Sequence, residues 1–183
     1  MENRQIVRFN MYEMEYNGST VESDLPFIPF EEKYYKQYKD LIDDCFYEMR
    51  KALNIQPYNK FCGSLEEVMK KKENFFLLLE GDEIICSVSC LENEIGNVLV
   101  NLKYQRQGYG RKVMEFALGY MQKRGDSSIK LTVTEWNKNA IALYEKLGFE
   151  IIKETTVEGI STRDAFNGNW TFEFTETGGL NLR

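Results

Sequence analysis

The sequence predicts a fold of the α+β class, a twisted and mostly antiparallel sheet that contains one parallel strand pair and is flanked by helices. Three observations predict it. Short apolar stretches joined by tight turns fill residues 74–102, as in an antiparallel meander. A helix and a further strand follow over residues 109–134, and a strand–helix–strand unit of this length joins parallel strands. The composition, 43% hydrophobic and 28% charged, is typical of a globular protein with a buried core.

Hydrophobic spacing and turn residues place the elements of the first half. Alternation predicts strands, and apolar side chains three and four residues apart predict helices. Pro26 and Pro29 confine their strand to a sheet edge. Ser64 and Glu67 form a capping box that opens a helix, and Gly81 begins a two-residue hairpin loop. The expected elements are strands over residues 4–16 and 25–30, helices over 31–53 and 64–72, strands over 74–80 and 84–91, a turn over 93–96 and a strand over 97–102.

The second half follows the same rules. A helix after Gly108 ends at Gly125, and another ends at Gly148, because glycine suits the position after a helix C-terminus. The expected elements are helices over residues 109–124 and 138–147, and strands over 129–134, 149–153 and 169–175. Because no repeat, low-complexity stretch or linker interrupts the chain, we expect one domain over residues 1–183, with an extra N-terminal strand in 1–25 and a C-terminal strand or tail in 158–183.

Composition excludes several classes of function. The chain has no histidine, which removes Ser–His, Cys–His and histidine-ligated metal mechanisms. Its net charge of −6 disfavours a nucleic-acid partner, which would need a basic face. No apolar run approaches the length of a membrane span, and no signal peptide opens the chain, so we expect a cytoplasmic protein without a membrane partner.

The four cysteines are Cys45, Cys62, Cys86 and Cys90. A structural zinc site would need all four, because the chain has no histidine ligand. Cys86 and Cys90 lie four residues apart in a predicted strand, so they share one face and are poorly placed to bond each other. We therefore expect reduced, mostly buried thiols and no bound metal.

The turn between the predicted strand and the helix at residues 101–111 is the most informative segment. Gly108 and Gly110 let the main chain approach a ligand closely, and the N–H groups at the start of the helix favour an anion. Four residues add local positive charge: Lys103, Arg106, Arg111 and Lys112. This combination is typical of phosphate binding, although an ordinary tight turn would fit the same residues. A dinucleotide fingerprint would need a third glycine where Val113 stands, and no phosphate-binding G-K-[ST] follows.

A second motif follows, and with it the chain resembles the GNAT superfamily of N-acetyltransferases. The family's phosphate motif, Q/R-x-x-G-x-G/A, is matched by Gln105, Arg106, Gln107, Gly108, Tyr109 and Gly110. Its second signature, N-x-x-A-x-x-L-Y-x-K-x-G-F, is matched by Asn137, Ala140, Leu143, Tyr144, Lys146, Gly148 and Phe149. The resemblance covers about residues 26–155 and is strong over 94–150.

The resemblance implies how the chain would hold acetyl-CoA. Two central parallel strands would splay apart, and the cosubstrate would lie in the gap, beyond the carboxyl ends of the strands. The main chain of Val98, Leu99 and Val100 would bond the pantetheine arm, and Asn137 would touch the cosubstrate from the other strand. The pyrophosphate would be held by the amides of Arg106, Gly108, Gly110 and Arg111.

Amine acetylation by direct transfer needs a proton acceptor and a proton donor. Tyr144 resembles the family's donor, because a phenol can protonate a departing thiolate, although on residues alone it reads as a core tyrosine. Glu94 matches the position of the base in the histone-acetyltransferase branch, and a solvent-facing turn carboxylate is the alternative. Glu135 is a weaker candidate base. A backbone N–H near Leu99 or Val100 would stabilise the oxyanion.

These motifs predict an acetyl-CoA-dependent N-acetyltransferase that acts on a primary amine of a small molecule or a peptide. The alternatives are transfer of another acyl group and a non-catalytic CoA-binding or regulatory module. Leu102 stands where the family often has proline, and Arg106 stands where glycine is common, so the turn could sit differently. Residues 1–25 and the tail have no clear counterpart in the family, and they could cover the acceptor site, extend the sheet or make a homodimer contact.

Overall fold

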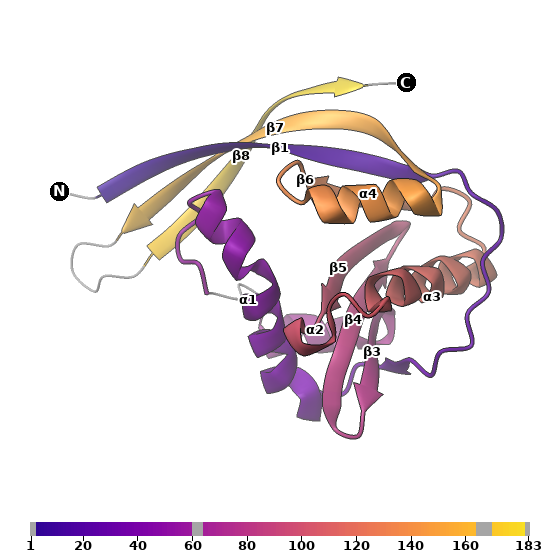
Figure 1. Cartoon of the computed structure of the whole chain (residues 1–183). Coiled ribbons are helices and arrows are strands. Elements are labelled where there is room, and N and C mark those ends of the chain that lie inside the picture. The colour runs from indigo at the N-terminus through magenta and orange to yellow at the C-terminus, as the bar shows by residue number, and fades with distance from the viewer. Residues whose placement is uncertain (1–2, 60–63, 164–169, 182–183) are drawn as a thin grey trace.

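The computed structural model describes the main chain of residues 3–59, 64–163 and 170–181, with the side chains of residues 6–59 and 64–160 (Figure 1). In chain order the elements are β1 (Asn3–Tyr16), β2 (Ile28–Pro29), η1 (Glu32–Tyr34), α1 (Tyr35–Ala52), α2 (Leu65–Lys70), η2 (Lys72–Asn74), β3 (Phe75–Glu80), β4 (Glu83–Leu91), β5 (Glu94–Val100), η3 (Leu102–Tyr104), α3 (Tyr109–Arg124), β6 (Lys130–Thr134), α4 (Lys138–Leu147), β7 (Phe149–Arg163) and β8 (Trp170–Asn181). Among the described residues, no helix is long and apolar enough to cross a membrane.

The strands form one mixed sheet in the order β2-β3-β4-β5-β6-β1-β7-β8. Every neighbouring pair is antiparallel except β5 and β6, which are parallel, so the predicted fold class is confirmed. The proline-bearing strand β2 lies at an edge, as Pro29 requires. The N-terminal strand β1 lies inside the sheet, between β6 and β7, and β8 extends the sheet at the other edge.

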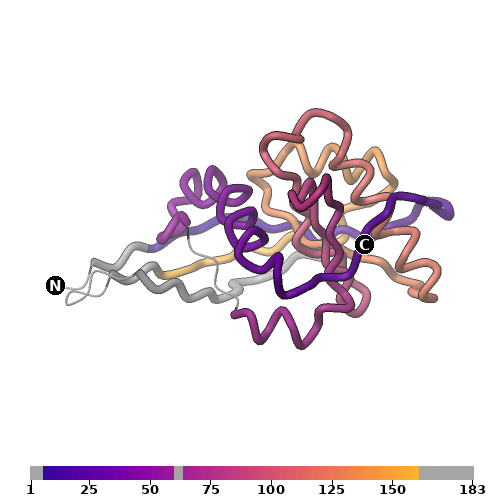
Figure 2. The backbone as a smooth tube through the Cα atoms, turned by 90° about the horizontal axis from the view of Figure 1, so that it is seen from below, coloured from indigo at the N-terminus to yellow at the C-terminus, as the bar shows by residue number. Residues whose placement is uncertain are grey.

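Helices cover both faces of the sheet. The α3–α4 face carries the larger core cluster, in which Met114, Leu118 and Ile141 pack on strand residues such as Ile95 and Leu131. On the opposite α1–α2 face, the cluster is formed by α1, α2 and the strand residues that alternate with the first set, among them Leu99. Figure 2 shows β1 and β7 running side by side, past the end of α1. Near that end a third, smaller cluster joins Val7, Phe9 and Val157 to Ile55.

Four predicted strands have wrong boundaries. The strand expected at 97–102 begins at Glu94, because Gly96 is not a turn residue: a Cβ there would meet the Ser89 hydroxyl at 2.9 Å, so this glycine permits close packing of β5 on β4. The strand expected at 149–153 continues to Arg163, since β1 offers it a partner along its whole length. The strand expected at 169–175 continues to Asn181, because β7 pairs with it that far. The strand expected at 25–30 is only Ile28–Pro29.

The segment before β2 crosses helix α3 at close range. The Val21 N–H donates to the Gln122 side chain at 2.9 Å, and the Gln122 amide donates to the Ser19 carbonyl at 3.3 Å. Gly119 lies beneath this crossing, and a Cβ at that position would come within 2.9 Å of the Val21 carbonyl oxygen. The absence of a side chain at Gly119 therefore allows the segment to lie on the helix.

Candidate active site

The parallel strands β5 and β6 separate soon after they begin. Their ladder holds two pairs, Glu94 with Lys130 and Ile95 with Leu131. Beyond Ile95 the two strands no longer pair, and the register of β5 against β4 shifts between Ser87 and Ser89, where Asn97 takes a positive φ of 45°. A bulge of this kind bends a strand away from its neighbour. The sheet therefore has a gap between β5 and β6, and the splay that the resemblance implies is present.

The edge of β5 that faces this gap carries the main-chain groups of Val100. The Asn101 N–H donates to the Ile85 carbonyl at 2.9 Å, and Leu99 is paired with Ser87, so both residues turn their main-chain groups toward β4. Because these groups alternate in direction along a strand, those of Val100 point away from β4 and toward the gap. The Val100 carbonyl accepts from the Gln105 amide at 3.1 Å and from the Cys45 thiol at 3.4 Å.

The turn after β5 has the backbone that a phosphate site needs. Gly108 has a φ of 84° and is the N-cap of α3, where it provides no side-chain hydrogen bond. The Lys112 N–H reaches the Gly108 carbonyl at 3.2 Å, so the N–H groups of Tyr109, Gly110 and Arg111 precede the first helical hydrogen bond. These uncapped donors lie at the positive end of the helix dipole, where an anion is stabilised.

Arg106 also adopts the left-handed conformation, with a φ of 62°. This conformation costs a residue with a Cβ about 1–3 kcal/mol, whereas glycine takes it freely. The positive φ thus gives a reason why glycine is common at this position in the family, and Arg106 adopts it although it carries a Cβ.

Side chains of the first motif hold the turn in place. Gln105 binds the end of β5 through the Val100 carbonyl, and the Gln107 amide donates to the Lys103 carbonyl at 2.9 Å. Asn101 donates to the Ile84 carbonyl at 3.1 Å, and its side-chain oxygen accepts from the Lys103 N–H at 3.1 Å. These polar side chains shape the loop, and the main chain is left to face a ligand.

The positive charge of the turn is partly neutralised within the protein. Lys103 pairs with Glu83, and the Arg111 guanidinium binds Glu115 at 2.8 Å. The Lys112 ammonium lies over the Tyr109 ring, 4.6 Å from its centroid. Within the described ranges, Arg106 has no carboxylate partner, so it is the side chain of the motif best placed to meet a phosphate.

Helix α4 packs directly against the start of α3. Asn137 caps α4, since its side-chain oxygen accepts from the Ala140 N–H at 3.2 Å. A Cβ on Gly110 would lie 3.3 Å from the Leu143 methyl group, so Gly110 lets the two helices approach closely. The contact brings both motifs to the same end of the gap.

Tyr144 is buried in α4, 8% exposed, in the core cluster that includes Ile95 and Leu131 and against which Val98 and Val100 pack. Its ring lies 6.0 Å from that of Phe149. Burial raises the pKa of the Tyr144 phenol to about 12, so the group stays protonated at neutral pH. No hydrogen bond joins this hydroxyl to another described residue. The side chain is thus both a core residue and a protonated donor without a protein acceptor.

Glu94 lies on the other face of the sheet. Its neighbour Ile95 packs in the cluster with α3 and α4, so strand alternation directs Glu94 toward the α1–α2 face. The carboxylate is exposed and accepts from the Thr132 hydroxyl at 3.2 Å, across the point where β5 and β6 begin to separate. Glu94 is therefore a strand residue at the closed end of the gap.

Glu135 is occupied by structural contacts. Its carboxylate accepts from the Asn10 amide at 3.1 Å and pairs with Lys138 at 3.3 Å, and the same amide donates to Glu154 at 3.0 Å. These bonds tie β1, β7 and the start of α4 together. A carboxylate held in this way is poorly placed to accept a proton from a substrate.

Sequence reasoning missed two polar contacts of the site. Cys45 comes from α1, far along the chain, and burial raises the pKa of its thiol to about 11, so it is a hydrogen-bond donor and not a thiolate. Thr132 looked like an ordinary outward strand residue. The alternation of β6 predicted which face it lies on, but only the parallel pairing places it beside Glu94.

These residues fit acetyl-CoA as a ligand. The uncapped α3 N-terminus and Arg106 suit a pyrophosphate, and the edge of β5 at Val100, with which β6 does not pair, suits the amides of a pantetheine arm. Cys86 and Cys90 are buried and free, whereas Cys62 lies outside the described residues. Among the residues that the structure describes, no three carboxylate, thiol or imidazole groups gather where they could hold a metal ion.

A sequence profile of the acetyltransferase (GNAT) family matches residues 35–149. The chain belongs to the GNAT family. The [ribosomal protein bS18]-alanine N-acetyltransferase of Escherichia coli K12 is 45% identical over 58 residues, which are 32% of this chain and 39% of that protein. The enzyme of the same name from Haemophilus ducreyi is 30% identical over 110 residues, 58% of this chain and 74% of that protein.

The solved structures agree on the GNAT fold. A GNAT-family acetyltransferase from Colwellia psychrerythraea superposes with a TM-score of 0.62 at 12% identity, covering 84% of this chain and 56% of that one. At this identity the similarity shows the fold alone. The GNAT chain described here covers only 39% of the length of the Escherichia coli relative.

Proposed function

We propose that this protein transfers an acetyl group from acetyl-CoA to a primary amine. One observation carries the proposal: Glu94 and Tyr144 lie on opposite faces of the sheet, and the gap between β5 and β6 is bordered by the strand edge between them. This arrangement suits direct transfer, because a base on one side can accept the proton of the amine that adds to the thioester carbon, while a donor on the other side protonates the sulfur that leaves the tetrahedral intermediate.

Each group would then have one task. Glu94, directly or through a water molecule, would accept the proton that the amine loses. The Val100 N–H would stabilise the negative charge on the thioester oxygen, and we favour it over Leu99, whose main chain pairs with β4. Tyr144 would give its proton to the departing sulfur. The α3 N-terminus and Arg106 would hold the pyrophosphate, and acetyl-CoA would supply the activated acetyl group.

We infer that the acceptor is an amine of a peptide or protein. The names of the relatives support this acceptor class, because those enzymes act on the alanine amine of a ribosomal protein. A ribosomal or similar protein substrate would place the enzyme in the cytoplasm.

The first test is a thiol-release screen with acetyl-CoA and a panel of free-amine peptides and small amines. The proposal expects at least one amine to release CoA well above the rate of background hydrolysis. If CoA binds and no amine gives turnover, the chain is a non-catalytic CoA-binding module.

The second test measures CoA binding by calorimetry in Gly108→Glu, with Gly81→Glu as the matched control. Both glycines have positive φ and open space around a Cβ position, but Gly81 lies in the β3–β4 hairpin. A carboxylate at residue 108 would face the pyrophosphate, so we expect at least a hundredfold loss of affinity in Gly108→Glu and none in Gly81→Glu. Equal affinity in both variants would contradict the phosphate site.

A further inference from the structure

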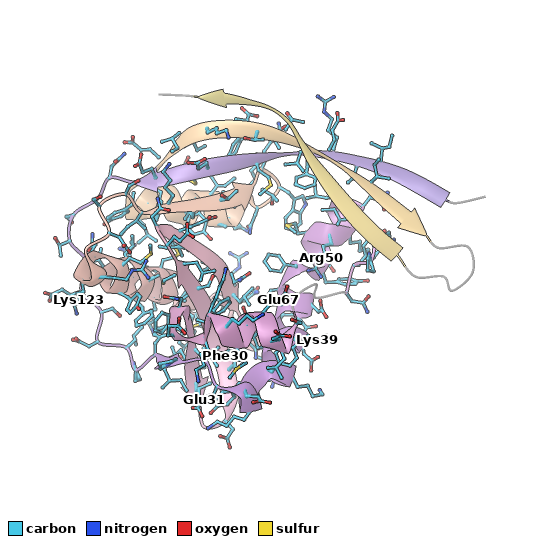
Figure 3. All side chains as sticks on the ribbon, turned by 180° about the vertical axis from the view of Figure 1, so that it is seen from behind. Phe30, Glu31, Lys39, Arg50, Glu67 and Lys123 are labelled. Carbon is cyan, nitrogen blue, oxygen red and sulfur yellow. The ribbon has the colours of Figure 1, made fainter. Side chains whose placement is uncertain are left out.

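A cavity lies on the α1–α2 face of the sheet and is lined in part by Leu91, the ladder partner of Glu94. Its volume is about 360 Å³, which is within the range of about 300–1,000 Å³ for small-ligand sites. Its apolar wall is formed by Tyr38, Val68, Phe75 and Leu91. Figure 3 labels Glu67 on α2, the helix that borders this cavity. The cavity could therefore take one apolar or aromatic side chain.

The ladder of β4 and β5 fixes the distance between this cavity and the candidate base. Leu91 pairs with Glu94 directly across the ladder, and both residues lie on the α1–α2 face. Cβ atoms of residues paired in this way lie about 5 Å apart. Asn97, at the bulge where the gap begins, also lines the cavity. An amine at Glu94 would thus carry the side chain of its own residue to the cavity mouth.

One cation on the rim of the cavity has no carboxylate partner among the described residues. Glu67 is held by the Ser64 capping box, whose hydrogen bonds lower the pKa of its carboxyl group. Lys70 binds Glu66 at 2.8 Å. Lys71 is exposed, and within the part of the chain that the structure describes it pairs with no carboxylate. A substrate carboxylate would find its partner there.

We propose that this cavity selects the acceptor: it takes the apolar side chain of the residue that bears the amine, while Lys71 binds a carboxylate next to it. This inference rests on the proposed function, and it assigns the acceptor side of the same site. A peptide that begins with an apolar residue followed by acidic residues has this chemistry. A free apolar amino acid has it too, with its own α-carboxylate at Lys71.

The test is binding of synthetic six-residue peptides to the CoA-loaded protein, measured by calorimetry. The probes begin Phe-Glu-Glu, Gly-Glu-Glu and Phe-Lys-Lys, and free phenylalanine forms the fourth arm. We expect the first peptide to bind at least about tenfold more tightly than the second and third. Comparable binding of free phenylalanine would identify an amino acid as the source, and weaker binding would identify a peptide.

Two variants connect the preferences to the cavity. Leu91→Trp should fill it and remove the preference for phenylalanine over glycine, whereas Leu65→Trp, on α2 and outside the cavity lining, should not. Lys71→Glu should abolish or reverse the preference for acidic residues, and its exposed neighbour Lys72→Glu should leave the preference intact. Thermal melts identify any variant that fails to fold, and the exposed Lys71→Glu variant then decides alone.

The outcomes separate this inference from the proposed function. Preferences that persist unchanged in Leu91→Trp and Lys71→Glu, or equal binding of all peptides, would overturn the cavity assignment even if acetyl transfer occurs. If Leu91→Trp removes the preference for phenylalanine and Lys71→Glu removes the preference for acidic residues, the cavity assignment is supported. This holds even if no peptide is acetylated, in which case only the proposed acetyl transfer fails.

Discussion

The crossing of residues 19–23 over α3 gives a prediction in which the same substitution destabilises the protein at one place on the helix and has almost no effect at another. At Gly119 an added Cβ would meet the Val21 carbonyl oxygen at 2.9 Å, which is part of a main chain held by the Gln122 side chain. At Gly110 it would meet the Leu143 methyl at 3.3 Å, at the end of a flexible side chain that can turn aside. We therefore compare Gly119→Ala with Gly110→Ala.

The expected free energies follow from the contacts. Inside a helix alanine is favoured over glycine by about 1 kcal/mol. Extra volume in a packed contact costs about 1–3 kcal/mol, and losing the hydrogen bond between Val21 and Gln122 costs about 0.5–1.5 kcal/mol more. The balance for Gly119→Ala is a loss of about 2 kcal/mol. Gly110→Ala should stay within about 0.5 kcal/mol of the wild type, because its contact can relax.

The assay is thermal and urea unfolding of the ligand-free protein, followed by circular dichroism. For a chain of this size about 2 kcal/mol lowers the melting temperature by roughly 4–8 °C. We expect that decrease in Gly119→Ala and almost no change in Gly110→Ala. A Gly119→Ala protein that melts at or above the wild-type temperature, or equal shifts in the two variants, would refute the close contact between residues 19–23 and α3.

Three further predictions concern the site. Tyr144→Phe should lower kcat by about a hundredfold and leave CoA affinity unchanged, and a variant with wild-type kcat would exclude Tyr144 as the proton donor. Because burial raises the pKa of Tyr144 to about 12, the wild-type rate should not fall through ionisation of this phenol between pH 7 and 10. Glu94→Gln should lower the rate most at low pH, because there the amine is protonated and must lose a proton before it can attack. If the pH–rate profile of the variant matches that of the wild type, Glu94 is not the base. Arg106→Gly should raise the free energy of unfolding by up to about 1 kcal/mol, since glycine adopts a φ of 62° without strain. The same variant should bind CoA severalfold more weakly. An affinity equal to that of the wild type, measured by calorimetry, would show that the charge of Arg106 does not reach the ligand.

Local signals in the sequence predicted the helices of this fold well. The capping box of Ser64 and Glu67 and the glycines after α3 and α4 act over a few residues, so their pattern identifies them directly. The bulge at Asn97 could not be read in this way. It depends on how β5 pairs with β4, and Gly96 therefore looked like a turn residue although it lies inside a strand.

The candidate site was predicted in part for the same reason. The turn of the phosphate motif is local, and Gly108 indicated one of its two positive φ angles, whereas nothing in the sequence indicated the other, at Arg106. The charge around it was overestimated, because Glu83 and Glu115, which neutralise Lys103 and Arg111, reach the turn only through folding. The cavity on the α1–α2 face combines residues from α1, α2 and three strands, and no spacing along the chain brings these together.

The place of β1 in the middle of the sheet has a consequence for how the protein assembles. Met11 pairs with Thr134 and Asn3 pairs with Arg163, so β1 can enter the sheet only when segments far along the chain are in place. Contacts this distant along the chain make folding slow, because a long loop must close before they form. Until β1 inserts, β6 lacks its neighbour on that side, and β6 forms one wall of the gap. Completion of the active site is therefore tied to the slowest step of assembly.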